Sequence, residues 1–189
     1  MDTPPVKPFV IGFRGLAGAG KTTLANHLHS LLRDSVIRPF AGPLKHVVEH
    51  SLGFDKETHP DLYRVCCQAL GHGARTVDPN IWVTHWKKGL ATIADAYFPG
   101  CGPRWIFVDD VRYPNEADCC DLLFFIHRPN NPQRLLTHES ESWNAAGYDP
   151  GVDHDSLVNT GDTPGLLVMA QRVLLQINVL HANPKPPCT

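Results

Sequence analysis

The stretch Gly15–Thr23, GLAGAGKTT, decides the fold. Its glycines and lysine follow the spacing G-x-x-x-x-G-K-[ST], which forms a loop whose backbone N–H groups surround a phosphate. The apolar run Phe9–Phe13 precedes the loop, and leucines at helical spacing follow it from about Lys21 to Arg33. This order of a buried strand, a glycine-rich turn and a helix predicts a phosphate-binding loop at the edge of an α/β sheet.

The loop supplies the first candidate binding residues: Gly15, Ala17, Gly18, Ala19, Gly20, Lys21, Thr22 and Thr23. We expect Lys21 to reach the β- and γ-phosphates of a nucleoside triphosphate and the Thr22 hydroxyl to ligate Mg²⁺. The alternative is a chance match in a glycine-rich turn. The flanking strand and helix argue against that alternative, because the phosphate-binding mechanism requires both.

Composition limits the remaining possibilities. A chain of 189 residues predicts a single domain with one sizeable core. The formal net charge of -2 gives no overall field for nucleic acid, and no segment resembles a signal peptide or a membrane span. We therefore expect no nucleic-acid partner, no membrane partner and a cytoplasmic location. The six cysteines lack metal-ligand spacing and are expected to be reduced thiols.

The rest of the chain alternates between strand and helix patterns. Strands are expected over Ser35–Phe40, Arg104–Asp110, Asp121–His127 and Asp155–Asn159, and helices over Pro43–Gly53, Asp61–Leu70, Asn80–Tyr97 and Gly165–Leu180. The glycines of GHGART, residues 71–76, should close the second of these helices. The pattern predicts an α/β fold, a three-layer sandwich with a parallel sheet. The core should cover about 9–181, with a mobile lid at about 128–150 and a disordered tail at about 182–189.

Charged residues near the expected strand ends are candidates for chemistry. Asp109 and Asp110 end the strand WIFV, where open α/β sheets place their ligands. One carboxylate there would hold Mg²⁺ through water or orient an acceptor, and Arg112 would clamp an acceptor phosphate. The alternative for the two aspartates is a simple turn.

Further basic residues lie along the chain at Lys45, Arg75, Arg128 and Arg134. Arg75 falls in the expected glycine-bounded loop, and Arg128 and Arg134 flank the lid segment, which would exclude water when closed. Each is alternatively a solvated surface charge. The chain has no NKxD motif of a switch GTPase, and its small size is typical of a phosphotransferase.

Taken together, four stretches resemble the bacteriophage-type deoxynucleoside monophosphate kinases: GLAGAGKTT, FAGPLKHVVEHSLG, LGHGARTVDPNIWV and FVDDVRYPNEAD. The similarity continues weakly through IHRPN, HESES and LVNTGD, and spans Phe9 to about Leu180. The loop motif is shared by many families, whereas DVRYPNEA and FAGPLK are more diagnostic. In this family an acidic residue often stands where this chain has Gly42.

The resemblance implies a nucleoside monophosphate kinase fold, with ATP and Mg²⁺ as cofactors and a deoxynucleoside 5′-monophosphate as substrate. It carries over Lys21 and Thr22 as the triphosphate and Mg²⁺ residues, and it matches Asp110 and Arg112 at the acceptor side. With the lid and strand-end positions added, the candidate catalytic residues are Lys21, Asp110, Arg112 and Arg128, and the candidate metal residues are Thr22 and Asp109. The acceptor residues that the resemblance implies are Lys45, Arg75, Asp78, Trp82, Asp110, Arg112, Asn115 and Glu116. A phage origin would place the protein in the cytoplasm of a bacterial host.

Two other functions stay open from the sequence. One is a small kinase with a hydroxyl acceptor, for which Asp109 or Asp110 would act as general base. The other is a nucleotide-dependent regulatory module that hydrolyses ATP slowly. The cluster His138–Ser142 is alternatively a helix start, an acceptor contact or a metal site, and a homodimer is an assembly that the sequence leaves open.

Overall fold

The computed structural model describes residues 8–96, 103–129, 131 and 142–182. The strands are β1 (Phe9–Arg14), β2 (Ser35–Ile37), β3 (Trp105–Val111), β4 (Leu122–His127) and β5 (Asp155–Val158). The helices are α1 (Lys21–Leu31), α2 (Gly42–His50), α3 (Pro60–Val77), α4 (Ile81–Ala96), α5 (Pro114–Ala117), α6 (Ser142–Ala145) and α7 (Thr163–Ala182).

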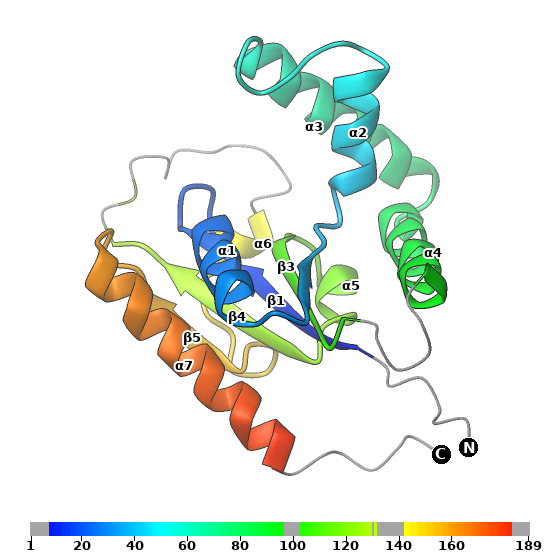
Figure 1. Cartoon of the computed structure of the whole chain (residues 1–189). Coiled ribbons are helices and arrows are strands. Elements are labelled where there is room, and N and C mark those ends of the chain that lie inside the picture. The colour runs from blue at the N-terminus through cyan, green and yellow to red at the C-terminus, as the bar shows by residue number, and fades with distance from the viewer. Residues whose placement is uncertain (1–7, 97–102, 130, 132–141, 183–189) are drawn as a thin grey trace, which may run out of the picture.

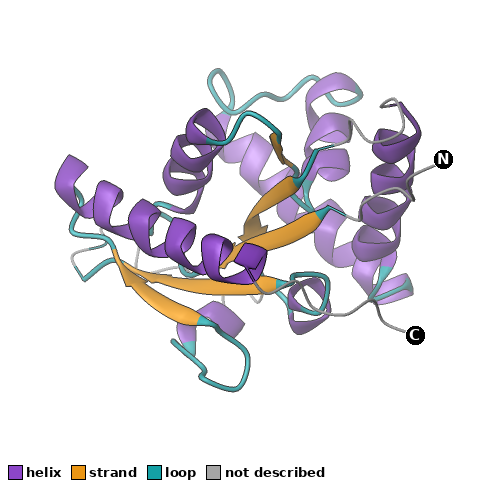
Figure 2. Cartoon of the chain, turned by 60° about the horizontal axis from the view of Figure 1, so that its bottom comes forward, coloured by secondary structure: helices purple, strands orange, loops and turns teal. Residues whose placement is uncertain are grey.

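The strands form one parallel sheet in the order β2-β3-β1-β4-β5. Its central strands are apolar on both faces, as expected for parallel strands that helices cover on each side. Figure 2 shows the strands between two layers of helices. The prediction of an α/β three-layer fold with a parallel sheet is confirmed.

Alternation along the strands divides the core into two clusters. Side chains such as Ile11, Phe107 and Phe124 pack with α1 and α7 on one face of the sheet. Val10 and Ile106 face the opposite side, where Trp86 of α4 covers them. Successive residues of a strand therefore point to different helix layers. The same alternation decides toward which layer each polar side chain at a strand end points.

Helices α2, α3 and α4 contact one another on one side of the molecule (Figure 1). The expectation that the glycines 71–76 end a helix is wrong, because α3 continues through Gly71 and Gly73 to Val77. A Cβ on Gly71 would meet Arg75 Nη1 at 3.4 Å and Leu44 Cδ2 at 3.5 Å, which are ordinary contacts, so α3 packs on α2 here without requiring a glycine. Arg75 consequently lies in the last turn of α3 and not in a loop.

The second strand is also shorter than expected. It ends at Ile37, and Pro39, which lacks an N–H group, follows before Phe40 turns into α2. Along the described ranges, no helix combines the length and apolar character that a membrane crossing needs.

Candidate functional site

The phosphate loop joins β1 to α1 at the carboxyl end of the sheet. Gly15, Gly18 and Gly20 have φ values of 136°, 75° and 100°, a region that favours glycine. A side chain on Gly15 would overlap the carbonyl oxygen of Ile126, and one on Gly20 would overlap the Asn159 amide. The first and last glycines of the motif are therefore required for their backbone angle and also for space.

Side chains hold the peptide groups of this loop in one direction. Every carbonyl oxygen of residues 15–19 accepts a side-chain hydrogen bond. Lys21 Nζ donates to Gly15 O (2.6 Å) and Leu16 O (2.9 Å), Asn131 Nδ2 to Ala17 O (2.6 Å), Arg128 Nη1 to Gly18 O (3.2 Å) and Asn159 Nδ2 to Ala19 O (2.7 Å). A peptide held by its oxygen directs its N–H away from that donor, which is the arrangement that an anion needs. Two N–H groups of the loop have protein acceptors: Gly15 donates to Asn144 Oδ1, and Ala19 donates to Leu16 O.

A cleft of about 520 Å³ opens beside the loop. Its walls come from the loop and the start of α1, from Arg128, from the turn between β5 and α7, where Gly161 and Asp162 lie, and from Leu166 in the first turn of α7. This volume is within the usual range for small-molecule sites. Arg128 therefore contacts the loop and also lines the cleft.

Thr22 and Asp109 form the candidate metal site. The Thr22 hydroxyl, exposed at the start of α1, donates a 2.6 Å hydrogen bond to Asp109 Oδ2. Asp109 is only 9% exposed, and its second oxygen, Oδ1, is buried and has no hydrogen-bond partner among the residues that the structure describes. A buried carboxylate oxygen without a donor is costly. A hydroxyl and a carboxylate next to a phosphate loop fit Mg²⁺, which binds through few protein oxygens and several waters.

Asp110 points to the other side of β3. Its two oxygens accept hydrogen bonds from the backbone N–H groups of Phe40 (2.8 Å) and Ala41 (2.9 Å). Burial raises the pKa of Asp110, and the nearby Lys45 ammonium opposes that rise. The carboxylate thus fixes the chain that enters α2, which carries half-buried Lys45.

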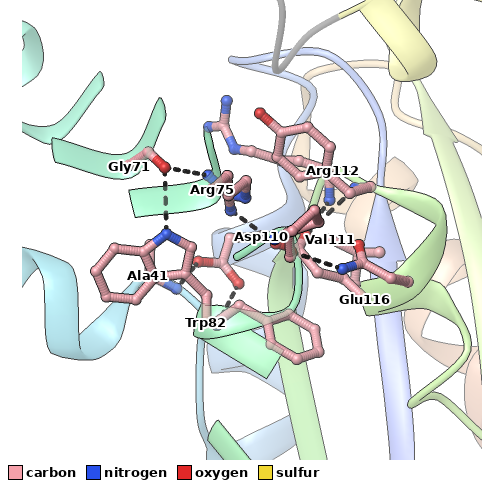
Figure 3. Close-up of polar contacts among 12 residues, drawn as sticks. Ala41, Gly71, Arg75, Trp82, Asp110, Val111, Arg112 and Glu116 are labelled. Carbon is pink, nitrogen blue, oxygen red and sulfur yellow. Dashed lines mark hydrogen bonds and ion pairs between the residues drawn. The ribbon is translucent and has the colours of Figure 1, made fainter. Parts of the chain in front are cut away.

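An ion pair links α3 to the turn after β3 (Figure 3). Arg75 Nη2 lies 2.9 Å from Glu116 Oε1, and the guanidinium stacks over the Tyr113 ring at 4.2 Å. Arg75 and the Trp82 indole also both donate to Gly71 O, at 3.3 Å each. Desolvation and the Asp110 carboxylate raise the pKa of Glu116 to about 7, although its N–H donors favour the ionised form.

The remaining residues of the DVRYPNEA stretch hold the turn in place. The Arg112 backbone N–H donates to Glu116 Oε2 at 2.8 Å, and Asn115 Nδ2 donates to Pro79 O at 3.0 Å. Asp78 is exposed and accepts from the backbone N–H of Asn80, at the turn before α4. The structure therefore brings Arg75, Trp82 and Glu116 together, and it places Asp78 at the outer end of this group.

Asn144 is a site residue that sequence reasoning missed. It is 2% exposed; its Oδ1 accepts from Gly15 N–H, and its Nδ2 donates to Val111 O, both at 3.2 Å. One amide thus connects the phosphate loop to the carboxyl end of β3. Asn131 and Asn159 were missed as well. Asn159 directly follows β5 and precedes a turn, so its place at the carboxyl edge of the sheet was the available signal.

Several expectations fall outside the described residues. These are Arg134, residues 138–141 of the His138–Ser142 cluster, and most of the central part of the lid segment at 128–150. At the two ends of that segment, Asn131 and Asn144 are buried. Among the described residues, no group of three or more His, Cys, Asp or Glu side chains gathers as a metal site would require.

Comparisons with known proteins support the fold. No family model and no curated protein matches the chain. Among solved structures, it is similar to the crystal structure of TT1252 from Thermus thermophilus, with a TM-score of 0.57 and 15% sequence identity. The likeness covers 91% of this chain and 98% of that chain. At this identity, the likeness shows the arrangement of the α/β layers and does not extend to the chemistry of the site.

Proposed function

We propose that the protein is a deoxynucleoside monophosphate kinase, which transfers the γ-phosphoryl group of ATP to the 5′-phosphate of a deoxynucleotide. The observation that supports binding of ATP and Mg²⁺ is the contact of Thr22 with Asp109 next to the phosphate loop. The buried Oδ1 of Asp109 has no hydrogen-bond partner among the described residues. The assignment of a deoxynucleotide as the phosphate acceptor rests on the resemblance of the FAGPLK and DVRYPNEA stretches to that family.

The phosphate loop explains how the donor would be held. The inward N–H groups and the Lys21 ammonium would neutralise the β- and γ-phosphates, and Arg128 lies on the cleft wall beside them. Thr22 and Asp109 would hold Mg²⁺, which supplies charge neutralisation between the two phosphates when bound. Lys21 is tied to carbonyl groups of its own loop, so a bound phosphate would replace contacts that already place the ammonium there.

The carboxylates at the end of β3 favour a phosphate acceptor over a hydroxyl acceptor. A hydroxyl acceptor needs a general base within hydrogen-bond reach. Both oxygens of Asp110 accept backbone N–H groups, and Glu116 accepts from Arg75 and Arg112. Asp109 is directed to Thr22. Asp110 and Glu116 are therefore not placed as free bases, and the Asp109 oxygen that Thr22 does not contact, Oδ1, is the one that we assign to Mg²⁺.

An acceptor phosphate needs no such base because it is already anionic near neutral pH. In the proposed reaction, an oxygen of the acceptor phosphate forms a bond to the γ-phosphorus while the bond from that phosphorus to the β,γ-bridging oxygen breaks. The electron pair of the broken bond remains on ADP. The protein's part is alignment and neutralisation of charge, with Lys21 and Arg128 on the donor side and the basic group around Arg75 on the acceptor side.

The test is ADP release from ATP and Mg²⁺ with each deoxynucleoside and ribonucleoside monophosphate added separately. We expect at least one deoxynucleotide to stimulate ADP release and to appear as its diphosphate. Asp109→Asn should lower the rate at least tenfold and raise the Mg²⁺ concentration needed for half-maximal activity. Asp118→Asn, which changes an exposed carboxylate after α5, serves as the matched control. ADP release that no mononucleotide changes would refute the acceptor assignment.

A further inference from the structure

Two histidines of helix α2 lie side by side, apart from the residues given roles above. His46 and His50 are four positions apart, their ring centres are separated by 4.2 Å, and the ring planes are inclined by 50°. Both residues are exposed. Residues four apart share one face of a helix, so this contact follows from the sequence spacing once α2 forms. The sequence of positions 46–50, HVVEH, also has the H-x-x-E-H pattern of a class of zinc enzymes.

The glutamate of this pattern is directed elsewhere. Zinc enzymes that carry two histidines four positions apart on a helix use a neighbouring glutamate as general base. Burial, and then a hydrogen bond with Glu49, raise the pKa of the Tyr63 hydroxyl of α3, so Glu49 is engaged by a second helix. The described residues also form no group of three or more metal-binding side chains. The arrangement therefore supports binding of a metal ion by two imidazoles and does not support metal-assisted hydrolysis.

The distance between the two rings suits one shared metal ion. An ion binds an imidazole nitrogen at about 2.0–2.1 Å, and that nitrogen lies roughly 1.1 Å from the ring centre, so the ion lies about 3.2 Å from each centre. For centres 4.2 Å apart, the angle between the two ligands at the ion is then about 80–85°. Neighbouring ligands of a tetragonal complex, the geometry of Cu²⁺ and Ni²⁺, are about 90° apart. The pair therefore needs only small rotations of exposed rings to hold such an ion.

The surroundings of the pair also favour a cation. His50 is the last residue of α2, and the carbonyl groups at the end of a helix carry a partial negative charge. Lys45 and Glu49 both act on Cys67 of α3, in opposite directions, so these two charges lie together on the neighbouring strip of the helix and offset each other. The charge of the helix end is therefore available to an ion held by the two rings.

We propose that His46 and His50 together bind one divalent ion of a late transition metal, with water in the remaining positions. Imidazole nitrogens suit Ni²⁺, Cu²⁺ and Zn²⁺, whereas Mg²⁺ prefers oxygen ligands. The site therefore differs in both place and metal from the one that we assign to Thr22 and Asp109. This inference does not rest on the proposed kinase activity, because neither histidine belongs to the donor or acceptor residues. An ion that bridges the two rings should also stabilise the last turn of α2.

The measurement is titration calorimetry with Ni²⁺, without ATP and with Mg²⁺ in excess, at about pH 7.5, where an ordinary imidazole is mostly neutral. We expect His46→Asn and His50→Asn each to bind one equivalent fewer than the wild type, or that equivalent at least tenfold more weakly. The matched control is His85→Asn, an exposed histidine of α4 that lines the same cleft as His46, and it should keep the equivalent. Comparison between the proteins separates this site from any other metal-binding side chains of the chain, which are the same in all of them.

A second readout is the melting temperature. Without metal it should be the same in all four proteins, because the three histidines are exposed. Ni²⁺ should raise it in the wild type and in His85→Asn more than in the other two variants, since an ion that binds the folded chain stabilises it. Equal stoichiometry and affinity for Ni²⁺ in all four proteins would overturn the proposal. Loss of the equivalent in His85→Asn as well, or its displacement by Mg²⁺, would overturn the assignment to two imidazoles.

Discussion

Asp153→Asn should destabilise the protein far more than the same change at an exposed ion pair. Arg14, the last residue of β1 before the phosphate loop, is 1% exposed. Its Nε and Nη2 donate to the two oxygens of Asp153 at 2.6 and 2.5 Å, and Asp153 is 4% exposed. The guanidinium also lies 4.3 Å from the Trp143 ring centre, so the pair ties 143–153 to the loop.

The size of the effect follows from what the substitution leaves behind. An asparagine at 153 removes the negative charge, and the Arg14 cation stays buried, with one nitrogen, Nη1, already unpartnered. Breaking a buried pair on one side costs about 3–5 kcal/mol, because the remaining charge is uncompensated. A chain of this size loses about 2–4 °C in melting temperature per kcal/mol, so the expected drop is roughly 6–20 °C.

The control is Asp155→Asn, which breaks the pair of Asp155 with Arg172. In that pair, Arg172 Nη2 also contacts both carboxylate oxygens, but the side chain of Asp155 is 23% exposed and that of Arg172 is 48% exposed. Exposed ion pairs contribute at most about 1 kcal/mol to stability. Urea unfolding at pH 7 gives both free energies. The double variant Arg14→Met with Asp153→Leu should recover part of the loss, since it leaves no buried charge. Equal losses for Asp153→Asn and Asp155→Asn would refute the argument from burial.

Three further predictions concern single side chains of the site. The pKa of Glu116 is raised in the folded state to about 7, from an ordinary 4.5. Its contribution to stability is therefore complete below pH 4.5 and is lost as pH rises through 7. In Glu116→Gln, the free energy of unfolding should fall less steeply between these two pH values, by at most about 1.4 kcal/mol per pH unit. Gly20→Ala should lower the melting temperature and abolish binding of a fluorescent ATP analogue, because Gly20 has a positive φ and an added Cβ would overlap Asn159. Its control is Gly73→Ala within α3, where an added Cβ meets no atom, and this variant should be more stable by about 0.5–1 kcal/mol. Asn144→Asp should weaken binding of the same analogue at least tenfold, because a carboxylate cannot donate to Val111 O; unchanged affinity would show that the phosphate loop does not depend on this amide.

The fold was predictable where the deciding interactions are local in sequence. The apolar runs of β3 and β4 and the spacing of the phosphate loop identified the strands and their order along the chain. Helix α3 was not predictable from propensity, since Gly71 and Gly73 lie inside the helix and end nothing. A glycine within a helix and a glycine that ends one look the same in a sequence.

The two aspartates of β3 show a different limit. As adjacent letters they were interchangeable candidates for Mg²⁺. In a strand, however, they point to opposite faces. Phe107 belongs to the cluster beside α1, and Asp109, two residues on, reaches Thr22 of α1; Val108 faces the other layer, and Asp110 reaches the chain entering α2. The alternation of side chains along a strand therefore separates the two roles, once one residue of β3 is assigned to the α1 face.

The phosphate loop itself depends on residues that its motif does not contain. Its carbonyl groups are held by Arg128, Asn131 and Asn159, and its first N–H by Asn144, across sequence separations of 110 to 140 residues. The glycines permit the loop's backbone angles, but these donors select which side the N–H groups face. Because β4 lies next to β1 and β5 lies next to β4, the turns that follow these two strands arrive at the loop from the side opposite β3. The strand order therefore makes the binding geometry possible, and a chain with the same nine-residue motif but without these asparagines would lack half of the side-chain contacts that hold the loop.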